Sequence, residues 1–364
     1  MDQKHRFLYL DGIRGISAVV LTICHFGDRT PQGILLKHGY LAVDFFFLLS
    51  GFVLCYAYER KLAAGMTWAG FLQRRVVRLY PLYLLGLVLG SATVFAMGQL
   101  TGHDLSTFAE ALVFALFLIP FPHTVHYTLD AFPLNGPAWA LSYELAINLV
   151  YAMVGFARSN RGLLTIIMVS FVFYSVSAAV YGTYLVGPSV GQAWGGLLRT
   201  SYSFFLGVLI FRLSDLGKPV PKWTWWVATL IFYGCLAAPR MVAGNRPLDA
   251  VILTVVLPSV LFFGARCEVP KVLERFCEAS GELAFPIYML HFPVVELASR
   301  YSNAHHLADG PAFAVMLAAT ALIVVLSWVV VKFYDAPVRA WLNGMIYARR
   351  GADPAASRSG GVGA

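Results

Sequence analysis

Ten stretches of this 364-residue chain are apolar and long enough to cross a membrane as helices. A helix rises 1.5 Å per residue, so about 20 apolar residues span the hydrocarbon core of a bilayer. Charged residues make up only 13% of the chain, well below the roughly one quarter usual in soluble proteins. The sequence therefore predicts an all-α polytopic membrane protein with about ten transmembrane helices. The predicted spans are 10–27, 39–58, 79–98, 138–157, 162–182, 196–212, 223–239, 248–265, 282–299 and 312–333.

An eleventh apolar segment, 108–121, is shorter and ends in Ile-Pro-Phe-Pro. If this segment does not cross and the N-terminus is cytoplasmic, most of the 27 lysine and arginine residues fall on the cytoplasmic side, as the positive-inside rule requires. If segment 108–121 crossed the membrane, the later part of the chain would be inverted. Arg158, Arg161 and the basic residues that follow on the cytoplasmic side would then lie outside. We therefore expect both termini to be cytoplasmic and 108–121 to be re-entrant or interfacial. The same rule explains the net charge of +8 without a nucleic-acid partner.

The chain divides into one membrane domain, 1–338, and a tail, 339–364, whose Gly/Ser/Ala-rich end predicts a largely disordered cytoplasmic segment. The largest hydrophilic insertions are an inner loop at 59–78 and an outer stretch at 99–137. Asp11 and Arg14 interrupt the first apolar stretch, so no cleavable signal peptide is expected. The five cysteines are scattered without a Cys-x-x-Cys pair, which predicts reduced thiols and no metal site.

Ionisable residues within the spans are the main functional signal, because burial of a charge in lipid costs several kcal/mol. His25 lies about 16 Å beyond Arg14 along the first helix, near the outer end. Asp44 and Glu144 follow the outer starts of two inward-running spans, so we expect both to lie at the depth of His25. His291 falls near the middle of the ninth span.

A histidine beside a carboxylate is the arrangement of a general base. The imidazole accepts a proton from a hydroxyl, and the carboxylate fixes the tautomer of the ring. Either Glu144 or Asp44 is able to partner His25, and the sequence leaves that choice open. The alternative is that these groups only hydrogen-bond one another and hold the helices together.

On the cytoplasmic side, the run Arg74-Arg75-x-x-Arg78 places three guanidinium groups on or beside one helix face. Arginine binds phosphate in a bidentate manner, so this run and Arg14 are candidates to hold a phosphorylated donor. The alternative is a run that only enforces topology or contacts anionic lipid.

Other polar residues carry weaker signals. The outer-loop histidines lack carboxylate or cysteine partners at metal-ligand spacing, so we expect them to be surface residues. They are His123, His126, His305 and His306. Cys24 and Ser142 are possible nucleophiles, but a buried thiol is usually inert and no Gly-x-Ser-x-Gly elbow surrounds Ser142.

Five motifs in order carry a resemblance to a known family. The Arg14-x10-His25 spacing, GYLAVDFFFLLSGF, RRVVR, PAWALSYEL and YMLHFP together resemble acyltransferase family 3, a family of membrane O-acyltransferases. The resemblance extends from residue 7 to about 335. Ala140 and Ala42 stand where the family usually has Ser and Gly, so no hydroxyl role is expected at 140.

The resemblance implies transfer of an acyl group, usually acetyl, from cytoplasmic acyl-CoA to a hydroxyl of a glycan or related acceptor. It implies essential roles for Arg14 and His25, and contact of the Arg74, Arg75 and Arg78 run with the CoA phosphates. Acyl-CoA would be a donor substrate, so no permanently bound cofactor is expected. The expected location is the bacterial plasma (inner) membrane. The residues expected at the substrate site are Trp139, Ser142, Tyr288 and His291.

Two mechanisms and one rival function remain open. His25 either deprotonates the acceptor for direct attack on the thioester, which we favour, or is acylated first and passes the acyl group on. The rival is a secondary transporter, which also has intramembrane His, Glu and Asp. A transporter favours inverted repeats, and no correspondence between the two halves is visible in the sequence.

Overall fold

The computed structural model describes residues 7–27, 36–98, 104–154, 159–239 and 246–351, and every regular element in these ranges is a helix. Seven helices are long and apolar enough to cross a membrane in this part of the chain. The α-helices are α1 (Leu8–Gly27), α2 (Ala42–Ala63), α3 (Trp68–Ala96), α4 (Asp104–Leu116), α5 (Ala138–Met153), α6 (Asn160–Tyr181), α7 (Ala193–Leu213), α8 (Thr224–Leu236), α9 (Arg246–Val251), α10 (Leu257–Gly264), α11 (Lys271–Ala304), α12 (Asp309–Val330) and α13 (Ala336–Gly351).

Two π-helical turns join neighbouring helices into longer ones. The turn η3 (Ile252–Val256) connects α9 to α10, and η4 (Val331–Asp335) connects α12 to α13. The two resulting helices are among the seven candidate spans. The predicted spans at α5, α8 and α11 are not among the seven. The helices α5 and α8 have 16 and 13 residues, and α11 carries several charges in its 34 residues.

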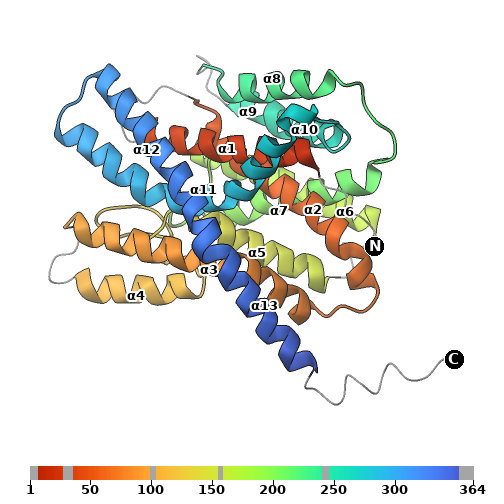
Figure 1. Cartoon of the computed structure of the whole chain (residues 1–364), viewed down its shortest axis with the longest axis horizontal. Helices are drawn as coiled ribbons and strands as arrows, with labels where there is room; N and C mark the ends of the chain where they lie inside the picture. Colours follow the sequence, from red (N-terminus) through yellow and green to blue (C-terminus); the bar gives the residue numbers. More distant parts are fainter. Residues whose placement is uncertain (1–6, 28–35, 99–103, 155–158, 240–245, 352–364) are drawn as a thin grey trace.

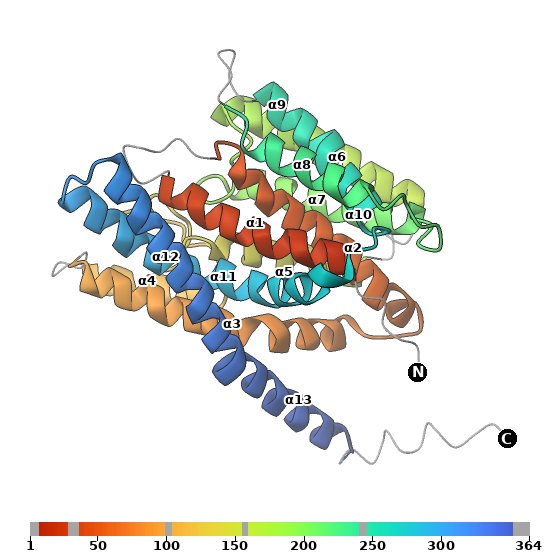
Figure 2. The same ribbon diagram turned by 45° about the horizontal axis from the view of Figure 1, so that its top comes forward.

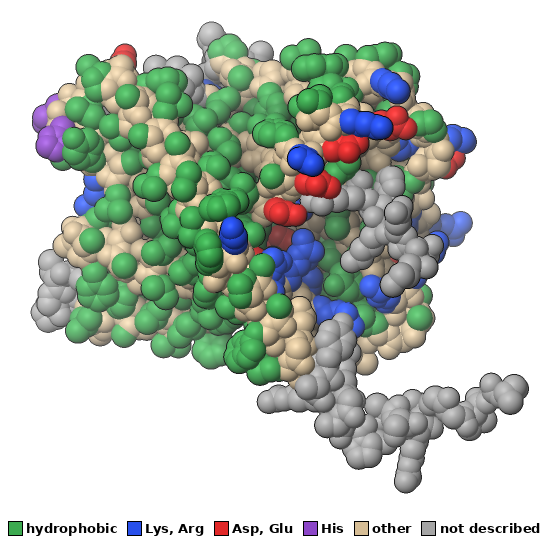
Figure 3. Space-filling model, in the orientation of Figure 1, with side chains coloured by type: hydrophobic (Ala, Val, Ile, Leu, Met, Phe, Trp, Pro, Cys, Tyr) green, Lys and Arg blue, Asp and Glu red, His purple; other side chains and the backbone are tan. Residues whose placement is uncertain are grey.

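The helices form two groups around a central layer (Figures 1 and 2). The helices α8, α9 and α10 lie on one side, and α3 and α4 lie on the other. Between them α1 packs along α11, and α2 packs along α7. Charged side chains gather at one end of the face in Figure 3, and most of the remaining surface there is hydrophobic, as expected for a membrane protein.

Small residues let α1 and α11 approach closely. A Cβ atom on Gly15 would lie 2.1 Å from the main-chain oxygen of Ser280, and one on Gly281 would lie 2.6 Å from the Cβ of Asp11. Glycines at both positions therefore permit direct backbone packing, as is common between membrane helices. This contact fixes Arg14 and His25 of α1 against α11.

Three predicted boundaries are wrong in detail. The inner loop expected at 59–78 is mostly helical, because α2 continues to Ala63 and α3 begins at Trp68. In the outer stretch 99–137, residues 131–137 are buried, so the chain enters the molecule before α5 begins. The predicted tail from 339 begins within α13, and residues 352–364 lie outside the described ranges.

The segment that was expected not to cross lies along α3. The last carbonyls of α4, those of Ala115 and Leu116, accept hydrogen bonds from Tyr83 and Tyr80 of α3. The chain then turns at Leu118, whose φ is +55°, and returns toward Tyr127. The end of α4 is thus capped by side chains of α3 instead of a continuing helix.

Candidate functional site

A cavity of 510 Å³ opens where the charged side chains gather. It is formed by α1, α2, α3, α5, α11 and the α12–α13 helix, so segments from both ends of the chain contribute. Its volume lies within the roughly 300–1,000 Å³ usual for ligand sites. The charged residues that line it are Arg14, Arg75, Arg78, Glu144, Glu282, Asp335 and Arg339.

Arg14 lies on the α1 wall of this cavity. Its Nη2 donates to the main-chain oxygen of Gly281 at 2.6 Å and lies 3.2 Å from a carboxylate oxygen of Asp11. The guanidinium therefore bridges α1 and α11 while part of it remains exposed. An arginine held in this way keeps further N–H donors for a ligand.

Arg75 is held by Glu144 on the facing wall. Its Nη2 donates to Oε1 of Glu144 at 2.8 Å, and Ser50 donates to the same oxygen at 2.6 Å. In the amide orientation that satisfies both groups, Asn148 accepts from Arg75 and donates to the main-chain oxygen of Glu144. Arg75 is buried, so this carboxylate neutralises its charge. The contact joins α2, α3 and α5.

The other two arginines of the predicted run differ from each other. Arg78 lines the cavity and is exposed, and within the described ranges it has no hydrogen bond or ion pair. Arg74 does not line the cavity, and its buried Nε has no partner among the described residues. An exposed, unpaired guanidinium at a cavity is the group best suited to bind an anion.

Asp335 and Arg339 complete the cavity, and neither is among the site residues predicted from the sequence. They form an ion pair at 2.7 Å, and Asp335 is buried at the end of the π-helical turn η4. Such turns are frequent at functional sites. The signal in the sequence was an Asp and an Arg four residues apart directly after an apolar span.

His25 does not line this cavity but lies against a second histidine beyond it. Its ring stacks on that of His291, with centroids 5.3 Å apart and planes 21° from parallel. The ring of His291 is in turn 5.9 Å from that of Tyr288, which does line the cavity. His25 lies in α1, which is one of the seven candidate spans, whereas α11, which carries His291, is not among them. Their contact was not predicted.

The surroundings of His291 fix its tautomer. Its Nδ1 lies 2.8 Å from the main-chain oxygen of Tyr288 and 3.2 Å from that of Ile287. Carbonyl oxygens only accept hydrogen bonds, so Nδ1 carries a hydrogen. In the neutral ring the lone pair is then on Nε2. His291 is fully buried.

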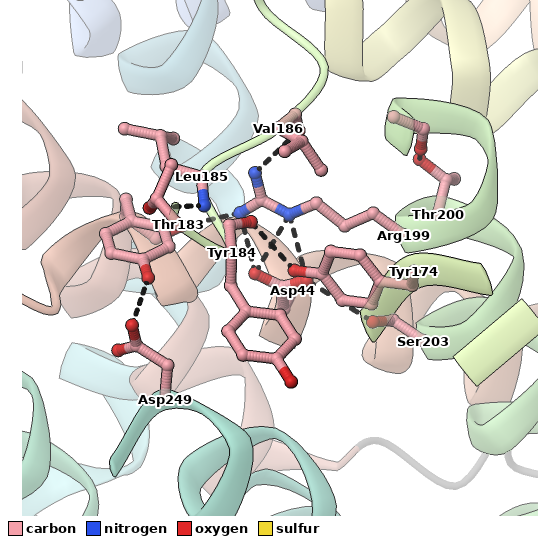
Figure 4. A network of polar contacts seen from close by, with 12 residues as sticks. Asp44, Tyr174, Thr183, Tyr184, Leu185, Val186, Arg199, Thr200, Ser203 and Asp249 are labelled. Atoms are coloured by element: carbon pink, nitrogen blue, oxygen red, sulfur yellow. Dashed lines mark hydrogen bonds and ion pairs between the residues drawn. The ribbon is translucent and has the colours of Figure 1, made fainter. Parts of the chain in front are cut away.

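The prediction that Asp44 and Glu144 converge on His25 is wrong. Asp44 is fully buried and bound by Arg199 through Nε and Nη2, the shortest contact being 2.6 Å, with Ser203 at 3.5 Å (Figure 4). Glu144 bonds to Ser50 and Arg75 instead, as described above. Asp44 therefore neutralises a buried arginine that also donates to the oxygens of Val186 and Tyr40.

The reason for the error lies in where α5 begins. The predicted depth of Glu144 assumes that Gly136 lies at the outer surface, but residues 131–143 are all buried. The chain has already entered the molecule before Ala138, so Glu144 reaches the arginine-lined cavity. Helix length and hydropathy do not report such an offset, because the preceding segment is irregular.

The remaining predicted substrate residues fall into two groups. Tyr288 lines the cavity and donates to the main-chain oxygen of Pro137 at 3.0 Å. Ser142 donates to the oxygen of Leu118 at 2.6 Å, and the ring of Trp139 lies 5.3 Å from the guanidinium of Arg199. Neither Ser142 nor Trp139 lines the cavity. Among the described residues no group of three His, Cys, Asp or Glu is placed to hold a metal ion.

Comparison with known proteins gives the family. A family described as an acyltransferase domain, family 3, matches residues 7–332, nearly the whole chain. "Protein 2 in picA locus" of Rhizobium radiobacter is 40% identical over 191 residues, which cover 48% of this chain and 96% of that protein. "Acyltransferase MdmB" of Streptomyces mycarofaciens is 30% identical over 154 residues, 40% of this chain and 38% of that protein. No solved structure matches. With its all-helical fold and its match over residues 7–332, the chain belongs to acyltransferase family 3.

Proposed function

We propose that this membrane acyltransferase moves an acyl group, acetyl in the first instance, from cytoplasmic acyl-CoA to a hydroxyl of a carbohydrate or glycoconjugate. The observation that carries the proposal is the course of α1. Arg14 lies at the arginine-lined cavity, and His25 lies about 16 Å further along the same helix, beyond that cavity and against His291.

The donor would bind with its phosphates at the arginine-lined cavity. Arg78 is the foremost anchor because it is exposed and unpaired within the described ranges. Arg14 and Arg339 line the same space and add two further positive charges to it. Arg75 is occupied by Glu144, so its role is to hold the wall and not to bind phosphate directly.

The pantetheine arm would then run from the cavity past Tyr288 toward His25. An extended pantetheine chain is about as long as the separation of Arg14 and His25, roughly 16 Å. The ring contacts from Tyr288 to His291 and from His291 to His25 support this direction. The thioester carbonyl would lie beside the imidazole pair.

The chemistry assigned to His25 is general base catalysis. The imidazole takes the proton of the acceptor hydroxyl as its oxygen attacks the thioester carbonyl. The carbon–sulfur bond breaks, and the thiolate of CoA leaves and receives the proton from the imidazolium. In the alternative, a ring nitrogen of His25 attacks the thioester first and the thiolate of CoA leaves. The acceptor hydroxyl then attacks the acyl-histidine, the acyl–nitrogen bond breaks, and the ring nitrogen receives the hydroxyl proton.

The proposed setting is a bacterial inner membrane with ten spans and both termini in the cytoplasm. The positive-inside distribution supports this, and so does the position of Arg14, Arg78 and Arg339 at one cavity. In this arrangement α5, α8 and α11 cross in addition to the seven candidate spans, α4 is re-entrant, and lipid surrounds the bundle.

The function is tested with purified protein in proteoliposomes supplied with acetyl-CoA labelled in the acetyl group. Release of CoA together with labelled ester in an envelope glycan fraction is the expected result. Base-catalysed hydrolysis of the product, which releases labelled acetate, shows that the bond is an ester. Solute counterflow that does not depend on acyl-CoA, with no labelled ester, would contradict the proposal and support a secondary transporter.

A further inference from the structure

A second cavity, of 310 Å³, lies between α3, α11 and the segment around residues 127–134. Helix α11 lines both spaces: Tyr288 belongs to the arginine-lined cavity, and Phe292 and Glu296 belong to the second one. His291, stacked on His25, lies between them along the helix. We call this second space the Glu296 cavity.

The walls of the Glu296 cavity are held in place by specific contacts. A Cβ atom on Gly90 of α3 would lie 1.8 Å from the oxygen of Leu134, so the buried segment before α5 rests directly on that helix. Pro293 cannot donate to the oxygen of Met289, and the side-chain amide of Asn135 donates to that oxygen instead, at 3.3 Å. The segment therefore joins α3 and α11 around a preformed space.

The polar groups of this cavity suit a ligand rich in hydroxyls. Thr93 donates to the oxygen of Leu89, so its oxygen lone pairs are available to accept. The oxygen of Thr128 accepts from the main-chain N–H of Asp130, so its hydroxyl hydrogen is available to donate. The carboxylate of Glu296 accepts, and Arg300 lies 3.5 Å from it. The aromatic rings of Tyr127 and Phe292 add apolar faces.

The charge of the lining separates the two cavities. Arginines line the first cavity, whereas the second is lined by Glu296 and by no lysine or arginine among the described residues. The negative charge of Glu296 thus disfavours an anionic ligand in the second cavity, and its polar carboxylate disfavours a purely apolar ligand. The volume is at the lower end of the usual range for ligand sites, about 300–1,000 Å³, so one ring fits better than a long segment of polymer.

From these observations we infer that the Glu296 cavity is the acceptor site and that it binds a neutral pyranose ring through Thr93, Thr128 and Glu296. This inference rests on the proposed acyl transfer for its biological meaning, but binding of the ring is a separate property. It is tested without acyl-CoA.

The binding test is protection of an introduced cysteine from alkylation. Met97 lines the cavity and is replaced in Met97→Cys; the matched control is Leu129→Cys, on a side chain that is 67% exposed and does not line the cavity. Purified protein, in a detergent without a sugar head group, is treated with a charged maleimide and methyl hexopyranosides of gluco, galacto and manno configuration. Wild-type protein gives the background from the native cysteines.

At least one pyranoside is expected to slow alkylation of Met97→Cys about tenfold when present at roughly ten times its Kd, and to leave Leu129→Cys unchanged. Adding Thr93→Phe, which fills the cavity, is expected to abolish the protection, whereas Val88→Phe, on an exposed face of the same helix, is not. No protection by any of the three pyranosides, or equal protection after Thr93→Phe, would overturn the inference.

The transfer assay separates this inference from the proposed function. With acetyl-CoA as donor, Thr93→Phe is expected to raise the acceptor KM about tenfold or more and to leave the KM of acetyl-CoA within about twofold, a loss of at least 1.4 kcal/mol confined to the acceptor. Protection by a pyranoside without any acyl transfer would retain this site and overturn the proposed function. Acyl transfer without protection would retain the function and overturn this site.

Discussion

Arg75 of α3 donates to Glu144 of α5 at 2.8 Å in the wall of the arginine-lined cavity. The pair joins α3 and α5 through residues that are 69 positions apart in the sequence. Ser50 of α2 adds a second bond to the same carboxylate oxygen. Arg75 is buried, so its positive charge depends on Glu144 for compensation.

This relationship predicts that Glu144 acts on stability more than on proton transfer. Glu144→Ala leaves a buried guanidinium unpaired and should lower the free energy of unfolding by about 3 kcal/mol. Glu144→Gln keeps an oxygen that accepts from Arg75 and should lose less than half of that. Thermal unfolding of both variants in detergent measures the difference. If Glu144 were instead the partner of the catalytic base, both variants would lose acyl transfer equally without a matching order of stability.

Arg78 and Arg74 give a matched pair for the donor site. Arg78→Gln removes an exposed guanidinium that lines the cavity and should weaken acyl-CoA binding about tenfold, or 1.4 kcal/mol. Arg74→Gln changes a neighbouring arginine that does not line the cavity. It should reduce the binding free energy of acyl-CoA by less than a third of the loss caused by Arg78→Gln. The measurement is the Kd of acyl-CoA at two salt concentrations, because Arg78→Gln should also reduce the salt dependence of binding. Equal effects of the two variants would indicate a general basic surface.

The buried pair of Asp44 and Arg199 should act as one structural unit. Both side chains are fully buried, so Arg199→Met alone should cost about 3–5 kcal/mol by leaving the carboxylate unpaired. The double variant with Asp44→Leu should recover part of that loss, which gives a coupling energy above about 1 kcal/mol. The exposed pair Asp215–Lys218 serves as the control, with coupling below about 1 kcal/mol. Additive losses at Asp44 and Arg199 would contradict this account.

His291 should act as a positioning residue for His25. His291→Gln removes the stacked ring but keeps a polar side chain, and should slow acyl transfer about tenfold while shifting its pH–rate profile. A purely structural role would change stability and leave the pH profile unmoved. The measurement is kcat/KM across pH for the variant and for wild-type protein, with His305→Gln, in an exposed position, as the control.

Hydropathy and charge predicted the helical membrane fold because both follow from local composition. The long helices lie close to the predicted spans, as at α1 and α6. Arg14, Arg75 and Arg78 line one cavity, whereas Arg74 does not. The partners of the buried carboxylates were not predictable. They depend on the irregular entry of residues 131–137 and on the rotation of α7 that presents Arg199, and neither leaves a periodic signal in the sequence.

The contributions of η4 and α13 to the cavity were not predicted from the sequence for a related reason. A π-helical turn at 331–335 shifts the helical register, so Asp335 and Arg339 face the cavity at positions that regular helix periodicity does not indicate. The stacking of His25 on His291 likewise depends on how closely α1 and α11 pack, which the paired glycines permit but do not specify.

The central claim is that His25 performs the proton transfer at a site separate from the donor anchor. The most direct test is the rate of labelled acetyl transfer by His25→Ala, measured beside the Kd of acetyl-CoA for the same protein, with Cys24→Ala as the neighbouring control. We expect His25→Ala to lose about 10²–10⁴-fold in transfer rate and to keep the Kd of acetyl-CoA within about twofold, and Cys24→Ala to retain transfer. Transfer by His25→Ala at the wild-type rate would contradict the account.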